Sequence, residues 1–262
     1  MSGHSPRLLL PVVVLVYIGL LAPLVVVVAV SFGPSAAFEF PPSGFTLHWF
    51  EAFFASREFV TSFFRISLVV GLLAALVATL LGTAASVALV RFRFFGREAL
   101  ETFFLLPLLV PQILLGAALY LLYARLAIQA SIWTLLCGHL VICTPYVIRS
   151  VTAGLVGMDP RLEEAAMSLG ATRVQAFFKV TLPLLRSSLL SGAIFAFIIS
   201  FSDINLALFL SGPESTSLPV HLFSQIQWQG DPTIAAASSL QIVIIGTLIL
   251  VVQRIFRLRL MV

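Results

Sequence analysis

Long apolar runs separated by short polar stretches dominate this chain of 262 residues. An α-helix needs about 20 predominantly apolar residues to cross the hydrocarbon core of a bilayer, and the chain has room for six such runs. The pattern therefore predicts an all-α membrane protein with six transmembrane helices. The predicted spans cover residues 8–32, 60–90, 103–124, 132–155, 187–211 and 233–254.

The first apolar run has two readings, a cleaved signal peptide or a membrane anchor. It follows Arg7 and ends near Ala29-Val30-Ser31, which is similar to a signal-peptide cleavage site. The apolar core of a signal peptide is only about 7–15 residues long, so the greater length of this run favours an uncleaved anchor. The amphipathic segment 46–54 that follows is expected to lie at the membrane surface.

The amino-acid composition also indicates a protein that is embedded in a lipid bilayer. Hydrophobic residues make up 60% and charged residues 10% of the chain, and the mean hydropathy is +1.10. The net charge of +4 does not indicate nucleic-acid binding, because the cations stand at the ends of apolar runs. By the positive-inside rule, the side of the membrane that holds most of these cations is the cytoplasm, together with both termini. The cations on that side are Arg7, Arg91, Arg93, Arg97, Arg161, Arg173, Lys179, Arg186, Arg254, Arg257 and Arg259.

The chain lacks the residues that ATP hydrolysis or metal binding would require. A phosphate-binding loop needs a lysine followed by Ser or Thr, whereas Lys179 is the only lysine and Val180 follows it. Cys137 and Cys143 point in different directions on one predicted helix, and no Cys/His cluster has ligand spacing. We therefore expect a non-enzymatic chain with no metal and no cofactor of its own.

A stripe of small residues runs along the second predicted span. Small side chains at helical spacing let helix backbones approach closely inside a bilayer, so the stripe should face protein. That protein is either the rest of this chain or a second subunit. The stripe consists of Gly71, Ala75, Ala78, Gly82 and Ala85.

The polar segment 156–186, here called the elbow, predicts two short helices between the fourth and fifth spans. Asp159-Pro160 is a helix start, and Glu163 and Glu164 then meet the positive end of the helix dipole. Gly170 ends this first helix. A second helix begins at a capping box of Thr172 and Gln175 and runs through Phe177, Phe178 and Lys179, and Pro183 opens the fifth span.

Asp203 is the acidic residue predicted deepest within a span. A carboxyl group is costly against lipid, so a place on a substrate path is the first hypothesis for Asp203, with Ser200 on the same helical face. Asn205 falls on another face of a regular helix and is expected to bind a neighbouring helix or to join the path. The alternative is a structural carboxylate that pairs with Arg149 or with another subunit. His139 and Gln241 are expected to make packing contacts.

Two stretches carry a resemblance to a known family. Glu164-Ala165-Ala166, Gly170, Val180 and Leu182-Pro183 resemble the cytoplasmic signature loop of the permease subunits of type I ABC importers. Residues 200–213, with Leu218-Pro219, resemble the second membrane subunit of the spermidine/putrescine-type importers. Many members of that group have two adjacent acids where this chain has Ser202 before Asp203. The commoner isoleucine of the loop is replaced by Val180.

The resemblance implies a single permease domain over residues 1–262, with the elbow docked into a cleft on a nucleotide-binding subunit. The residues that it places in this ATPase coupling are Glu163, Glu164, Ala165, Ala166, Leu169, Gly170, Phe177, Phe178, Leu182 and Pro183. It implies three partners in a bacterial inner membrane: a cytoplasmic ATPase dimer that binds ATP and Mg²⁺, a related second permease, and an extracytoplasmic solute-binding protein. Transport of a polyamine-like solute by alternating access is the expected function.

Other functions are open from the sequence alone. The same subunit pattern is shared by importers of iron(III), thiamine, aminoethylphosphonate and opines. A proton-coupled secondary transporter that uses Asp203 is the rival from another class, although such carriers often hold several ionisable groups and paired broken helices. A scaffold subunit without a substrate path is the third possibility.

Overall fold

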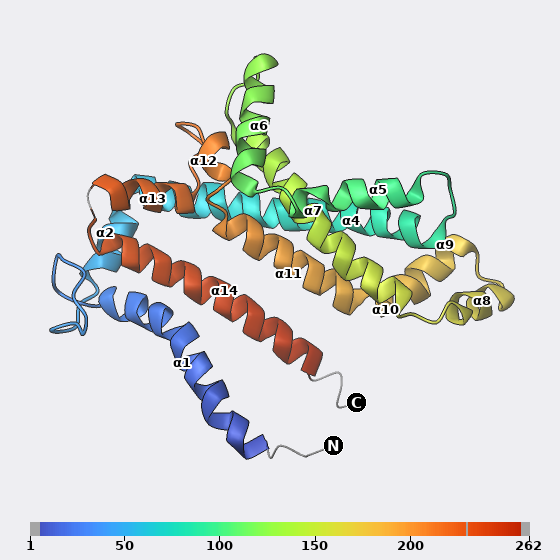
Figure 1. Cartoon of the computed structure of the whole chain (residues 1–262), viewed down its shortest axis with the longest axis horizontal. Helices are drawn as coiled ribbons and strands as arrows, with labels where there is room; N and C mark the ends of the chain where they lie inside the picture. The colour runs from blue at the N-terminus through green and yellow to red at the C-terminus, as the bar shows by residue number, and fades with distance from the viewer. Residues whose placement is uncertain (1–5, 229, 258–262) are drawn as a thin grey trace. The chain divides into compact units, whose positions relative to one another are not determined.

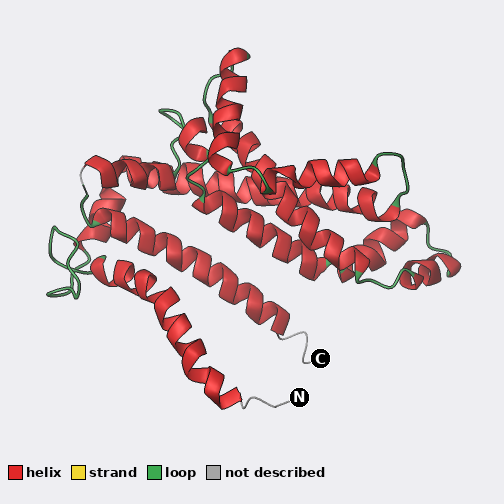
Figure 2. Ribbon diagram, viewed as in Figure 1, coloured by secondary structure: helices red, strands yellow, loops and turns green. Residues whose placement is uncertain are grey.

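Every regular element is helical within the residues that the computed structural model describes, 6–228 and 230–257 (Figure 2). These residues form two compact units. One unit combines the residues up to Val60 with Leu222–Thr247, and the other combines Thr61–His221 with the residues from Leu248 onward. We describe each unit by itself.

The first unit is built from α1 (Pro6–Val30), α2 (His48–Ala55), α3 (Arg57–Val60) and most of α14 (Thr233–Arg257), and α13 (Leu218–Trp228) begins in the other unit. The loop before α2 is fixed by Trp49, whose Nε1 donates a hydrogen bond of 2.8 Å to the carbonyl oxygen of Gly33. Because α2 buries Trp49 and Phe53 while Glu51 stays exposed, the predicted amphipathic helix is confirmed.

Three long helices pack together in the second unit (Figure 1). They are α4 (Val69–Arg91), α7 (Ile132–Val156) and α11 (Arg186–Ser202). The prediction that the small stripe of the second span faces protein is confirmed. Gly71 lies against the ring of Phe197 on α11, and Gly82 lies against Val147 on α7. The stripe therefore packs inside this chain.

The remaining elements of the second unit are shorter. The π-helix η1 (Thr61–Leu68) runs into α4, and the amide of Leu218 donates a 2.7 Å hydrogen bond to Ser67 Oγ. After α4 come α5 (Arg97–Leu105), the 3₁₀ turn η2 (Leu106–Leu108) and α6 (Gln112–Arg125), and after α11 comes α12 (Ala207–Leu210). The helix α12 packs on α6 and α7.

Within the part of the chain that the structure describes, four helices are long and apolar enough to cross a membrane, and two bent helix pairs bring the number of candidate spans to six. The four lie at Leu10–Val30, Arg57–Arg91, Ile132–Val156 and Thr233–Arg254. The bent pairs are Arg97–Leu108 with Gln112–Arg125, at 102°, and Arg173–Leu184 with Arg186–Ser202, at 66°. The predicted class, an all-α membrane protein, is confirmed.

The prediction of regular helices over residues 103–124 and 187–211 is wrong. In the third span, Pro107 and Pro111 lack the backbone N–H that would continue the helix, and the chain turns sharply between η2 and α6. In the fifth span, α11 ends at Ser202 because Asp203 has an extended backbone, with φ −71° and ψ 130°. The helical faces predicted beyond Ser202 therefore do not exist.

Candidate functional site

The first helix of the elbow, α8 (Arg161–Ser168), begins and ends as predicted. The Asp159 Oδ1 atom accepts a 3.0 Å hydrogen bond from the amide of Arg161, which holds the chain at the start of the helix. At the other end Gly170 has a φ of +95°, a left-handed conformation that glycine adopts without steric cost. The chain can therefore turn sharply into the second helix.

The second helix of the elbow also begins as predicted but extends further. Thr172 and Gln175 form a reciprocal capping box at the start of α9 (Arg173–Ala176). The helix continues through the π-helix η3 (Phe177–Thr181) and α10 (Leu182–Leu184) and then bends by 66° into α11. Pro183 lies before this bend, in α10, so the prediction that it opens the fifth span is wrong.

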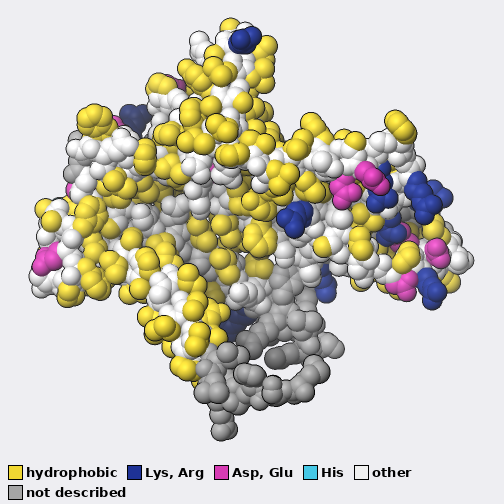
Figure 3. All heavy atoms as spheres, in the orientation of Figure 1, with side chains coloured by type: hydrophobic (Ala, Val, Ile, Leu, Met, Phe, Trp, Pro, Cys, Tyr) yellow, Lys and Arg dark blue, Asp and Glu magenta, His cyan; other side chains and the backbone are white. Residues whose placement is uncertain are grey.

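The outward face of the elbow carries exposed apolar side chains among charged ones. Leu169 is 90% exposed and Phe178 is 58% exposed. Glu164, Ala165 and Pro183 are also exposed, whereas Ala166, Phe177 and Leu182 are half-buried. Figure 3 shows charged side chains gathered at the end of the unit where the elbow lies. Large exposed apolar groups in such polar surroundings are typical of a protein-binding surface.

Three further exposed apolar residues belong to this outward face and were absent from the predicted set. They are Leu162, Met167 and Val174. The position of Leu162, three and four residues before Ala165 and Ala166, was a signal available in the sequence, since residues three or four apart share a helix face.

Glu163 makes contacts with α4 and with the second helix of the elbow. Its Oε1 atom accepts a 3.0 Å hydrogen bond from Arg91, the last residue of α4, and a second from the hydroxyl of Thr181. A cleft of about 450 Å³ adjoins this contact and is lined in part by Phe92, Met167 and Phe177. The predicted coupling residue Glu163 therefore contacts its own subunit, whereas the side chain of Glu164 is exposed and also borders the cleft.

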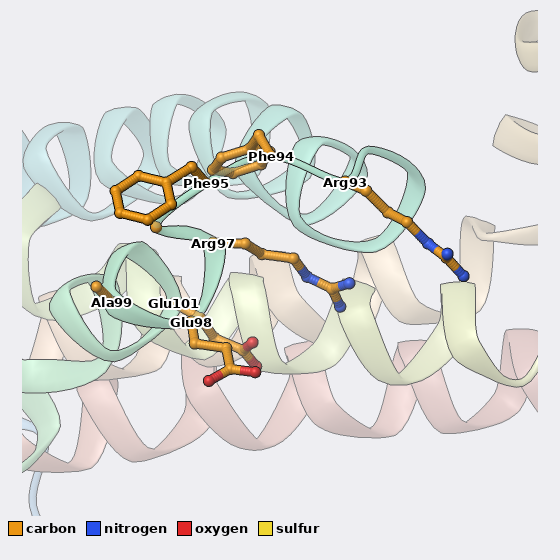
Figure 4. Close-up of a pocket in the computed structure, with 8 residues that line it drawn as sticks. Arg93, Phe94, Phe95, Arg97, Glu98, Ala99 and Glu101 are labelled. Carbon is orange, nitrogen blue, oxygen red and sulfur yellow. The ribbon is translucent and has the colours of Figure 1, made fainter.

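The turn between α4 and α5 forms a second hollow of about 600 Å³ at the same end of the unit (Figure 4). Arg93 and Arg97 extend to one side of it and the ring of Phe95 to the other, and Glu98 and Glu101 contribute carboxylates. Gly96 has a φ of +82°, which allows the tight turn. Two arginines and two glutamates line this hollow, so it has no clear preference for a ligand of either charge.

A buried polar cluster joins the fourth and fifth spans. The Nδ1 atom of His139 and the hydroxyl of Ser200 are 2.6 Å apart, and Nε2 of His139 lies 3.8 Å from Oδ2 of Asp203. The carboxylate of Asp203 also accepts hydrogen bonds from the amides of Leu206 and Ala207, so it caps the start of α12. Of the predicted substrate-path residues, Ser200 and Asp203 are buried and Asn205 is exposed.

The alternative in which Asp203 pairs with Arg149 is wrong. Arg149 is exposed on α7, and the partner that the structure places near Asp203 is His139, which the sequence analysis had assigned to ordinary packing. The two residues are 64 positions apart, and no local pattern brings them together. Asp203 ends one helix and begins the next, so its contacts explain why the fifth span breaks there.

We expect Asp203→Ala to lower the thermal unfolding temperature in detergent and Asp203→Asn to lower it much less. Alanine removes the cap of α12 and leaves buried amides without an acceptor, at a cost of about 1–3 kcal/mol, whereas asparagine still caps. Asn205→Ala, an adjacent exposed change, is the control and should leave the unfolding temperature unchanged. If the Asp203→Asn variant is stable but has lost uptake, the negative charge of Asp203 is instead required for binding the solute.

Comparisons with known proteins all point to membrane components of transport systems. The family described as "Binding-protein-dependent transport system inner membrane component" matches residues 78–262. The spermidine/putrescine transport system permease protein PotC of Haemophilus influenzae is 31% identical over 92% of this chain and 93% of its own length. The putrescine transport system permease protein PotI of Escherichia coli K12 is 34% identical over 87% and 83%.

A solved structure shares the fold. It is a bacterial ABC transporter involved in the import of the acidic polysaccharide alginate, and it matches with a TM-score of 0.72 at 16% identity, covering 96% of this chain and 94% of that chain. At that identity the likeness concerns the arrangement of helices alone.

Proposed function

The chain belongs to the family of binding-protein-dependent transport system inner membrane components, and from that premise we propose that its elbow is where a separate cytoplasmic ATPase drives transport. The chain is a multi-pass inner-membrane permease subunit of an ABC importer, and hence a transporter component rather than an enzyme. The points that we propose are the ATPase contact, the orientation, the other partners and the solute.

The outward face of the elbow is the observation that carries the ATPase contact. Leu169 and Phe178 are exposed apolar side chains at the elbow, and a partner protein that covered them would bury this surface. The two short helices are held by a left-handed glycine and a capping box, so they can present these side chains as one rigid surface. We assign Glu164, Ala165, Ala166, Leu169, Gly170 and Phe178 to this contact.

The solute that we propose is a small polyamine-like cation delivered by a solute-binding protein. The support is that two relatives are named for putrescine or spermidine transport. Ser202 stands where many spermidine/putrescine-type subunits have a further acid, so this chain offers one negative charge fewer there. Of the predicted path residues, Asn205 has the exposed side chain, while Asp203 shapes the break in the fifth span.

The remaining partners follow from the same premise. A second permease completes the pore, and ATP-driven closure of the ATPase dimer reorients the cavity between the two faces of the membrane. Both termini and the elbow face the cytoplasm, in agreement with the cations at the elbow end of the second unit. A rival carrier that uses Asp203 as a proton relay is less favoured, because that carboxylate is occupied as a helix cap.

We expect a tagged copy of this chain, purified from gently solubilised native membranes, to bring with it an ATPase and a second permease. Leu169→Arg should abolish recovery of the ATPase, because it places a charge in the centre of an apolar contact. Phe95→Arg, which introduces the same charge at another highly exposed apolar residue outside the elbow, should leave recovery intact. Mass spectrometry identifies the partners.

Recovery of the chain alone under several mild detergents would contradict the importer partnership and favour the carrier. Uptake of radiolabelled putrescine by cells that express the recovered set, and that lack their own polyamine importers, tests the solute. If the partners are recovered but putrescine is not accumulated, the coupling proposal stands and the solute belongs to another class.

A further inference from the structure

One carboxylate oxygen joins three elements at the elbow end of the second unit. Glu163 on α8 receives hydrogen bonds at Oε1 from Arg91, at the end of α4, and from Thr181, in η3. Arg91 lies 72 residues before Glu163, and Thr181 lies 18 residues after it. Both helices of the elbow and the second span therefore meet at a single atom.

The surroundings of this contact suit a mechanical role better than a contribution to folding. The side chains of Arg91 and Glu163 are 25% and 22% exposed, and an ion pair with that access to water stabilises a fold only slightly. Thr181 is fully buried, and its hydroxyl donates a hydrogen bond that holds the carboxylate of Glu163 in place. The same carboxylate oxygen also pairs with Arg91. The pair fixes where α8 lies relative to α4.

The second span is not adjacent to the elbow along the chain, because α5, α6 and α7 lie between them. The chain enters the elbow from α7 and leaves it into α11, so a push on the elbow acts directly on those two spans only. The cytoplasmic end of α4 reaches the elbow through Arg91 and the adjoining cleft. Apart from this ion pair, α4 is linked to the elbow through its packing on α7 and α11 and through the cleft that its end helps to line.

We propose that Arg91 and Glu163 are positioning residues that fasten the elbow to the second span, so that a push by the ATPase moves α4 together with α7 and α11. The proposal rests on the proposed function of the elbow and adds a residue pair that neither faces the ATPase nor meets the solute. Glu163 is thereby distinguished from its neighbour Glu164, which lies on the docking surface.

The test measures whether the end of α4 and the elbow move as one body. Spin labels are placed at Phe95→Cys and Arg161→Cys, two exposed sites on either side of the pair, after Cys137 and Cys143 have been replaced. The complete complex with its ATPase and second permease is measured by double electron–electron resonance, without nucleotide and after trapping with ATP and vanadate. The distance measurement itself needs no transported solute.

With the pair intact, we expect the same distance distribution in both states. Glu163→Gln and Arg91→Gln should each broaden and shift that distribution on trapping, and should lower the transport-coupled share of ATP hydrolysis about tenfold. The exchanged variant, Arg91→Glu with Glu163→Arg, should recover a single narrow distribution. Arg93→Gln, an exposed cation two residues further on, is the control and should behave as the wild type does.

The proposal is overturned if the wild-type distance already changes on trapping, or if the Gln variants keep one unchanged distribution. A Gln variant that no longer recovers the ATPase would also overturn it, because Glu163 would then belong to the docking surface. Failure of the wild-type chain to recover any ATPase is a different result. It removes the proposed function itself, and the pair with it.

Discussion

Gly170→Val is expected to reduce the amount of solute taken up per ATP hydrolysed by about tenfold or more while the membrane spans stay folded. At a φ of +95°, a residue with a Cβ atom is strained by about 1–2 kcal/mol, and a β-branched residue is a pronounced outlier. The space around Gly170 is open, so the strain comes from the backbone alone. The elbow can relieve it by unwinding the end of α8, because few buried contacts hold that turn.

Gly96→Val is the matched control for this result. Gly96 also has a left-handed backbone, at a φ of +82°, with open space where a Cβ would lie, but it stands in the turn between α4 and α5. Both variants carry the same backbone penalty, so only the position of the strained residue differs. Uptake and ATP hydrolysis are measured together in proteoliposomes that contain the complete importer, with putrescine as the solute.

Two outcomes would count against the elbow. If Gly170→Val and Gly96→Val lose coupling equally, the loss reflects general strain rather than the docking surface. If Gly170→Val keeps normal coupling, the left-handed turn is not needed to present Leu169 and Phe178. Glu164→Ala changes an exposed side chain without altering the backbone, and it should also uncouple the importer. This variant separates the contribution of the docking side chains from that of the backbone turn at Gly170.

The features that the sequence predicted correctly are those with local causes. A left-handed glycine, a capping box and a span-length apolar run each depend on residues within a few positions of one another. Gly170 and the Thr172–Gln175 pair were therefore placed correctly, and so were the unbroken helices Ile132–Val156 and Thr233–Arg254 to within a few residues. The small stripe on α4 was predicted for a similar reason, since its spacing is helical.

The features that were missed depend on contacts between distant residues or on a competing local contact. The ion pair of Arg91 with Glu163 and the contact of His139 with Ser200 span 72 and 61 residues, and no sequence periodicity indicates such partners. The break after Ser202 interrupts a run that reads as helical, because Asp203 caps α12 instead of continuing α11. The break in the third span did have a signal, the prolines at 107 and 111.

Gly82→Leu is expected to lower the stability of the second unit by about 1–3 kcal/mol or more, because the added side chain has no space between α4 and α7. A Cβ atom on Gly82 would lie 2.7 Å from Cγ1 and 2.8 Å from Cβ of Val147. Val147 is fully buried and β-branched on a helix, so it cannot turn aside into another rotamer. The two helices must separate, and lipid offers no hydrophobic drive that would restore their contact.

Gly246→Leu on α14 is the control, because Gly246 has open space for a side chain where Gly82 has none. A Cβ atom there meets nothing within 4 Å, and leucine favours a helix over glycine by about 0.8 kcal/mol, so this variant should be as stable as the wild type or more so. Thermal unfolding followed by tryptophan fluorescence in one detergent compares the two. Equal unfolding temperatures for both variants would mean that α4 and α7 are not held at the close distance that Gly82 permits, and that the small stripe serves a surface other than α7.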